Sequence, residues 1–105
     1  MTILKKLGNT KVVSDDGREI RIQFRLDCIA YIDNKRALYI GMTRINGQDG
    51  KTFIKIDAAS GFTNWLPPHA GEPLTQSKKI EILDFLEKTL SLLDYGFEIS
   101  NKPGN

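Results

Sequence analysis

One amphipathic helical stretch constrains the fold more than any other feature of the sequence. Between Thr75 and Tyr95, leucines recur at alternating steps of three and four residues, and other apolar residues widen the stripe. This spacing predicts a helix whose broad buried face must pack against other structure. We expect Thr75 to be the N-cap and Gly96 to be the left-handed residue that ends the helix. The stripe consists of Ile80, Ile82, Leu83, Phe85, Leu86, Leu90 and Leu93.

The part of the chain before this helix is rich in strand patterns. Residues 19–26 and 51–57 alternate between apolar and polar side chains, which is the period of a strand with one buried face. Turn-forming residues at 14–17, 33–35 and 46–50 separate the strand candidates. Neighbouring strands are therefore expected to pair as antiparallel hairpins.

Prolines separate the strand region from the helix. Pro67, Pro68 and Pro73 lack a backbone N–H and restrict φ, so they predict a stiff connector rather than more helix or strand. Residues 97–100 then have the pattern of one closing strand. We predict an α+β fold: a mostly antiparallel β-meander sheet packed by one long C-terminal helix, with a short closing strand.

Length, charge and cysteine content narrow the class of protein. With 105 residues the chain has room for one domain, expected over residues 1–100, with a disordered tail at 101–105. The net charge of +2 is too small to indicate a nucleic-acid or membrane partner by itself. One cysteine cannot form an intrachain disulfide, no apolar stretch approaches the roughly 20 residues that cross a bilayer, and the first residues do not resemble a secretory signal. We therefore expect a cytoplasmic protein without a membrane partner.

Two residues are candidates for chemistry. His69 is the only histidine and lies in a loop rich in proline and glycine, without a second His or a nearby Cys at ligand spacing. Cys28 alternates with apolar residues of a strand, as a small buried hydrophobe does. A Cys28–His69 nucleophile pair is the enzymatic alternative. We favour the structural interpretation of both, and we expect no enzyme activity, no cofactor and no metal.

The polar face of the strands offers a possible nucleic-acid surface. Arg21 and Arg25 point the same way along one predicted strand, and Tyr31, Tyr39 and Phe53 are expected on a related sheet face. Basic side chains among exposed aromatic rings are typical of proteins that bind single-stranded RNA. A solvated sheet face is the alternative that we favour.

The connector and the helix together resemble a known family. Trp65-Leu66-Pro67-Pro68-His69, then Glu72-Pro73-Leu74-Thr75, then an amphipathic helix and a closing strand are similar to small bacterial immunity proteins of polymorphic-toxin and contact-dependent growth inhibition systems. Trp65, Pro67, Pro68 and Glu72 match the family's motif. The resemblance implies a protein without catalytic residues that binds a cognate toxin domain and neutralises it by occlusion. Independently of the motif, a Trp just before two prolines more often packs between sheet and helix than it binds a ligand.

The expected partner surface is acidic. Electrostatic complementarity speeds the capture of a basic toxin. The net charge of +2 therefore implies either that the toxin is not strongly basic or that only a local patch such as Glu81, Asp84, Glu87 and Asp94 is used. We expect the toxin to contact four acids, which are Glu72, Asp84, Glu87 and Asp94. The alternative function is a small RNA or single-stranded nucleic-acid-binding module that uses the basic and aromatic sheet face.

Overall fold

A computed structural model describes residues 3–47 and 50–103 of the chain. It has an α+β fold with eight strands, one α-helix and one short 3-10 helix. The helices are α1 (Gln76–Leu92) and η1 (Phe24–Leu26). The strands are β1 (Leu4–Lys6), β2 (Lys11–Ser14), β3 (Arg18–Gln23), β4 (Cys28–Asp33), β5 (Arg36–Gly41), β6 (Thr43–Asn46), β7 (Thr52–Asp57) and β8 (Gly96–Ser100). The predicted fold class is confirmed.

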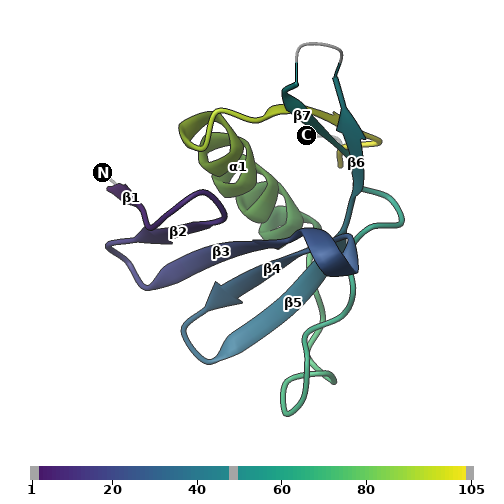
Figure 1. Ribbon diagram of the computed structural model, residues 1–105. Coiled ribbons are helices and arrows are strands. Elements are labelled where there is room, and N and C mark those ends of the chain that lie inside the picture. Colours follow the sequence, from purple (N-terminus) through teal and green to yellow (C-terminus); the bar gives the residue numbers. More distant parts are fainter. Residues whose placement is uncertain (1–2, 48–49, 104–105) are drawn as a thin grey trace.

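The strands form two sheets rather than one continuous meander. Strands β1 to β5 make a five-stranded antiparallel sheet in sequence order, joined by short turns (Figure 1). Strands β6, β7 and β8 make a three-stranded sheet, in which β6 is antiparallel and β8 is parallel to β7. The parallel pairing follows from the connection, because α1 carries the chain back from the end of β7 to the start of β8. The predicted hairpin loop at 46–50 joins β6 to β7, and its residues 48 and 49 lie outside the described part of the chain.

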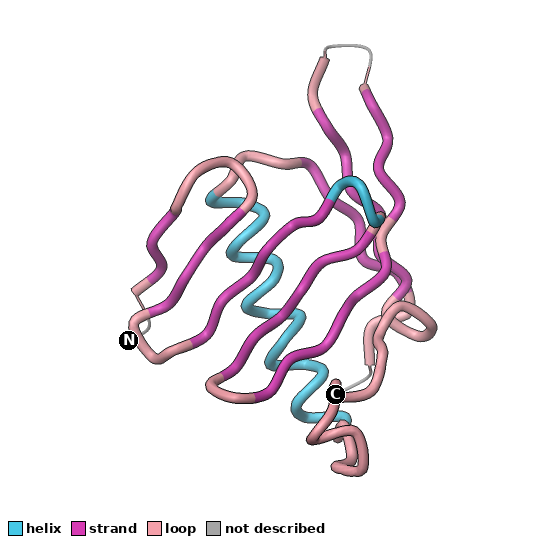
Figure 2. The backbone as a smooth tube through the Cα atoms, turned by 60° about the horizontal axis from the view of Figure 1, so that its bottom comes forward, coloured by secondary structure: helices cyan, strands magenta, loops and turns pink. Residues whose placement is uncertain are grey.

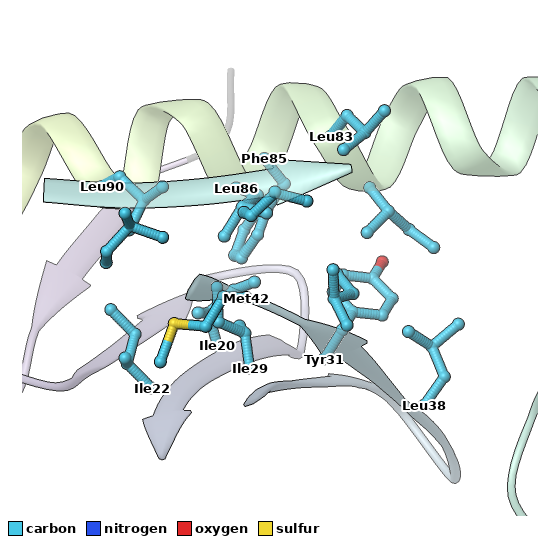
Figure 3. Close-up of a cluster of buried hydrophobic side chains, with 14 of the residues drawn as sticks. Ile20, Ile22, Ile29, Tyr31, Leu38, Met42, Leu83, Phe85, Leu86 and Leu90 are labelled. Carbon is cyan, nitrogen blue, oxygen red and sulfur yellow. The ribbon is translucent and has the colours of Figure 1, made fainter. Parts of the chain in front are cut away.

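Helix α1 lies across the inner face of the five-stranded sheet (Figures 1 and 2). Its buried residues point toward a row of strand side chains that share this face, as Figure 3 shows. The strand rows are set by register, since Val12, Ile20, Tyr31 and Leu38 pair in succession across β2 to β5. All four are fully buried. The predicted helix stripe is therefore core, except for Ile80, which is exposed because it lies beyond the edge of the buried face.

The two ends of α1 test the capping predictions. The Thr75 hydroxyl accepts a hydrogen bond from the Lys78 N–H at 3.1 Å, as expected of an N-cap. The prediction for Gly96 is wrong, because Asp94 takes the left-handed conformation with φ 64°. The Tyr95 N–H then donates to the Leu90 carbonyl and the Asp94 N–H to the Ser91 carbonyl, which is the Schellman arrangement. The chain thus turns two residues earlier than predicted, and Gly96 already belongs to β8.

The connector between sheet and helix runs along the outer edge of β5. Backbone bonds join Gly41 to Gly61, Thr63 to Tyr39 and Leu66 to Ala37, so residues 61–66 cover this edge. Trp65 is only 5% exposed, and its ring lies 6.4 Å from that of Tyr31. The indole therefore packs at the junction of sheet and helix, as predicted for a structural tryptophan.

Candidate functional site

A charged cleft of about 600 Å³ lies between the first half of α1 and the hairpin ends of the five-stranded sheet. Strand residues line one wall and one exposed side of the helix lines the other. The described lining residues that we call the charged cleft are Leu4, Asp16, Arg18, Asp33, Lys78, Glu81, Asp84, Phe85 and Lys88. Four of these residues are acidic and three are basic.

Arg18 organises the sheet wall of the cleft. Its Nη2 donates to Asp16 Oδ2 at 2.9 Å, and its guanidinium carbon lies 4.4 Å from the centre of the Phe85 ring. The hydrogen bonds from Arg18 and Ser14 lower the pKa of Asp16 to about 2, so this carboxylate is ionised at neutral pH. The ring of Phe85 and the carboxylate of Asp16 together hold the cation in one place.

Lys78 organises the helix wall. Its Nζ donates to Asp33 Oδ2 at 2.7 Å and to Glu81 Oε2 at 2.6 Å. Burial acts to lower the pKa of Lys78, but the hydrogen bonds to the two carboxylates outweigh burial and raise it. The ammonium therefore stays charged and ties the first turns of α1 to the end of β4.

A buried tyrosine donates a hydrogen bond to the carboxylate of this ion pair. The Tyr31 hydroxyl lies 3.0 Å from the same Asp33 oxygen, and burial together with the Asp33 charge raises the pKa of Tyr31 to about 12. The Tyr31 ring is fully buried and meets the Phe85 ring edge-on at 6.1 Å. Core packing thus fixes Asp33, and Asp33 fixes Lys78.

Two acids of the cleft lie on the exposed side of α1. Glu81 and Asp84 are exposed, and Asp84 pairs with Lys88 at 3.0 Å along the same helix face. Both belong to a helix whose opposite side is held in the core. Preorganised carboxylates of this kind can bind the guanidinium or ammonium groups of another molecule.

The four acids predicted to contact the toxin do not all line the charged cleft, although Asp84 and Glu87 together line a smaller neighbouring pocket. Asp84 lines the charged cleft, whereas Glu87 pairs with Lys102. Glu72 precedes α1 and Asp94 follows it, and the 17 residues of the helix place about 25 Å between its ends. Asp94 has a backbone role as the left-handed residue of the helix C-terminus. Only Asp84 remains a candidate within the cleft.

Glu72 has a structural partner on each side. Its Oε1 accepts from Arg36 Nη2 at 2.6 Å, and its Oε2 lies 2.5 Å from His69 Nδ1. The hydrogen bond from Arg36, followed by that from His69, lowers the pKa of Glu72. This cluster clamps the proline connector onto the start of β5. Pro67 and Pro68 are exposed beside it, joined by a cis peptide bond.

The residues predicted for nucleic-acid binding are scattered. Arg21 and Tyr39 do share the outer face of the five-stranded sheet, in one row with Lys11 and Ala30. Tyr31, however, faces the core and is fully buried. The predicted exposed position of Tyr31 is wrong, because its register partners Ile20 and Leu38 belong to the buried face.

Two further members of that predicted set lie elsewhere. Arg25 is in η1, because the strand ends at Gln23 and the alternation from residue 24 onward does not continue as strand. Phe53 is in β7 of the three-stranded sheet. Lys11 and Arg21 both pair with Glu19, which partly neutralises the remaining row.

Cys28 and His69 do not come together. Cys28 opposes Gly41 at one end of the β4–β5 hairpin, and its Sγ lies 3.3 Å from Gln23 Oε1. His69 is bonded to the Glu72–Arg36 pair at the other end of β5. Burial raises the pKa of the Cys28 thiol, with a further contribution from the Asp27 charge, and a raised pKa disfavours the thiolate form that a nucleophile requires.

Glu81 belongs to the acidic patch predicted from the sequence, whereas Arg18, Asp33 and Lys78 at the centre of the cleft were not singled out. Lys78 and Glu81 stand three apart on a predicted helix, so their pairing was within reach of sequence reasoning. The contacts of Lys78 with Asp33 and of Arg18 with Phe85 join residues that are remote in the sequence. No local sequence pattern predicts such contacts, because they depend on how the helix crosses the sheet.

Comparison of the chain with protein-family models, curated proteins and solved structures gives no match. Across residues 3–47 and 50–103, no three His, Cys, Asp or Glu side chains are grouped as metal ligands would be. In the same part of the chain, no helix has the length and apolar character needed to cross a membrane.

Proposed function

We propose that the protein is an immunity protein that binds a cognate bacterial toxin and neutralises it by occlusion. The observation that carries the proposal is the exposed pair of carboxylates, Glu81 and Asp84, on a helix whose other side is locked into the core. The toxin would present lysine or arginine side chains to the charged cleft. Such cationic groups surround the active sites of enzymes that act on nucleic acids, so covering them blocks activity.

The rigidity of the cleft supports a binding role. Each wall is held by ion pairs anchored to regular structure: Arg18 to Asp16 on the sheet side and Lys78 to Asp33 on the helix side. A surface whose charged groups are already ordered loses little conformational entropy when a partner binds. Electrostatic attraction to Glu81 and Asp84 would act mainly on the association rate.

The motif residues have a role in this proposal that does not require contact with the toxin. Trp65 packs on Tyr31, and Glu72 holds Arg36 and His69. Both contacts fix the connector that leads into Thr75, the N-cap of α1. The motif therefore positions the helix against the sheet, and the cleft is formed where they meet.

Co-expression with the toxin encoded beside this gene tests the proposal. Cells that carry the wild-type chain should survive toxin expression, and the double variant Glu81→Lys with Asp84→Lys should protect poorly, with association slowed roughly tenfold or more. Glu98→Lys, an exposed acid of the three-stranded sheet, is the matched control and should protect fully. Death of cells that carry the wild-type chain at the rate of unprotected cells would rule out the immunity function.

A nucleic-acid-binding module is the second candidate, and the aligned row of Lys11, Arg21 and Tyr39 on the outer sheet face favours it. Binding of single-stranded RNA through this row would weaken steeply with added salt. The measurement is a fluorescence titration with labelled single-stranded RNA at several salt concentrations, comparing the wild type with Arg21→Ala. Absence of binding at low salt would remove this candidate.

A further inference from the structure

We propose that the free edge of β6 joins a second copy of this chain, so that two three-stranded sheets continue as one six-stranded sheet. The two β6 strands would run antiparallel about a two-fold axis at Ile45. This surface is separate from the charged cleft and does not depend on the proposed function. Figures 1 and 2 show the β6–β7 hairpin extending away from the body of the molecule.

Within the described part of the chain, β6 pairs with a strand on one side only. The Gly47 N–H donates to the Lys51 carbonyl, and β6 continues in register so that Ile45 opposes Phe53 and Thr43 opposes Lys55. Because bonded pairs alternate along an antiparallel ladder, Thr43 and Ile45 bond to β7. Arg44 and Asn46 therefore direct their N–H and C=O groups outward. The outward N–H at the start of this edge, that of Met42, already donates to the Asp27 carbonyl at 2.9 Å.

One register uses both outward residues. With Arg44 opposite Asn46 of the second copy, and the reverse, four N–H···O=C bonds form and Ile45 meets its own copy on the axis. A cation then faces a neutral amide rather than another cation. The interface is isologous and closed, as a two-fold dimer requires.

Apolar side chains reinforce this register. Ile45 is 40% exposed and lies on the same sheet face as Phe53, its partner across β6 and β7. The Phe53 ring covers Gly96, where an added Cβ would approach Phe53 Cδ2 to 2.8 Å. Pairing two β6 strands would join these side chains into one apolar stripe of Phe53 and Ile45 from each copy. Directly opposed apolar side chains stabilise a strand pair.

The other sheet edges do not favour self-association in the same way. Residues 61–66 cover β5. In β1 the outward residues are Leu4 and Lys6, since Leu7 bonds to Lys11, and the equivalent two-fold pairing would place Lys5 against itself. In β8 the outward residues are Phe97 and Ile99, since Ser100 bonds to Ala58, and Glu98 would meet its own copy. Like charges directly opposite one another oppose pairing, so β6 is the self-complementary edge among these strands.

Sedimentation velocity over a range from low micromolar to millimolar protein tests this proposal. We expect the wild type to shift from monomer toward dimer within this range, because a short strand pair makes a small interface. Ile45→Lys should weaken the dimer roughly tenfold or more, because it sets two ammonium groups against each other on the axis. Asn46→Pro should also weaken it, since it removes an outward N–H without touching the bonds to β7.

The matched control is Lys6→Pro, which removes an outward N–H from β1 and should leave the dimer unchanged. Thermal unfolding of each variant identifies any that fails to fold. A monomer at every concentration would overturn the proposal, as would a dimer of equal strength in folded Ile45→Lys and Asn46→Pro. Protection from the toxin by Ile45→Lys is expected to be intact, so failure of this proposal is distinct from failure of the immunity function.

Discussion

The two sheets of this protein are built in different ways. The five-stranded sheet uses consecutive strands joined by short turns, and one edge is covered by residues 61–66 while the other carries lysines. The three-stranded sheet joins β6 and β7 to a strand that returns only after residues 58–95. Short-range pairing has a small loop-closure cost, whereas β8 can pair only when the helix brings it back.

Helix α1 has a different structural role in each sheet. Its buried face completes the core of the five-stranded sheet, and its C-terminal turn at Asp94 and Tyr95 sets where β8 begins. The charged cleft depends on the packing of the buried face, whereas the pairing of β8 with β7 depends on the position of the C-terminal turn. Substitutions in different parts of the helix and its neighbours should therefore affect the stability of one sheet more than that of the other.

The largest effect is expected from removing a helix side chain of the shared core. Leu86→Ala should lower the free energy of unfolding by about 2–5 kcal/mol, because Leu86 is fully buried and its loss leaves a cavity. Urea unfolding measures this change, and Lys88→Ala on the exposed side should change the midpoint little. Equal midpoints for the two variants would contradict the assignment of the buried face.

A smaller and more local effect is expected at Gly96. An added side chain would meet the Phe53 ring, so Gly96→Val should cost about 1–3 kcal/mol of overpacking in the three-stranded sheet. Amide hydrogen exchange should then quicken at Ile54 and Ile56 more than at Ile20 and Ile29. Gly71→Ala, where an added Cβ has no neighbour within 4 Å, is the matched control. Uniform loss of protection in both sheets would show that they unfold as one unit.

The difference between the sheets also explains what the sequence predicts well. Alternation and turn residues predicted the β4–β5 hairpin, where a tight turn at Asn34 and Lys35 leaves Asp33 opposite Arg36. The Thr75 cap and the buried face of the helix were also predicted from the sequence, because both depend on neighbours within one or two turns. Local interactions determine these features.

Features that depend on distant contacts were missed. Nothing near Phe53 indicates that it belongs to a separate sheet, since that depends on pairing with Gly96. The alternation of residues 19–26 predicted a strand through Leu26, but η1 interrupts it at Phe24, which packs edge-on against Tyr95. Asp84 was identified as a site residue, whereas Arg18, Asp33 and Lys78 require the helix and sheet to be brought together.

The acid dependence of stability should report on the cleft of the five-stranded sheet. The hydrogen bonds from Arg18 and Ser14 lower the pKa of Asp16 to about 2, from an ordinary value near 4. A lowered pKa in the folded state stabilises the protein above the ordinary value, and this stabilisation is lost as pH falls from about 4 to about 2. The contribution should be less than about 1 kcal/mol, because Asp16 is exposed.

Asp16→Asn should therefore flatten the pH dependence of the urea midpoint within this window. Glu98→Gln is the comparison in the three-stranded sheet, because its ion pair with Lys55 is longer, at 3.9 Å, and both side chains are exposed. We expect a smaller change there. A larger change for Glu98→Gln than for Asp16→Asn would contradict the prediction that the ion pair of the five-stranded sheet is the stronger one.

The smallest expected effect is an unchanged signal from Trp65, the only tryptophan. Its indole is buried against Tyr31 at the junction with the five-stranded sheet, so the native emission should be blue-shifted and resistant to iodide quenching. Because Gly96→Val perturbs the other sheet, this variant should keep the wild-type emission and quenching constant at low denaturant even where β7 exchanges faster. Emission of Gly96→Val that shifts to the red before global unfolding would show that damage at β8 reaches the connector, and that the two sheets share one packing unit.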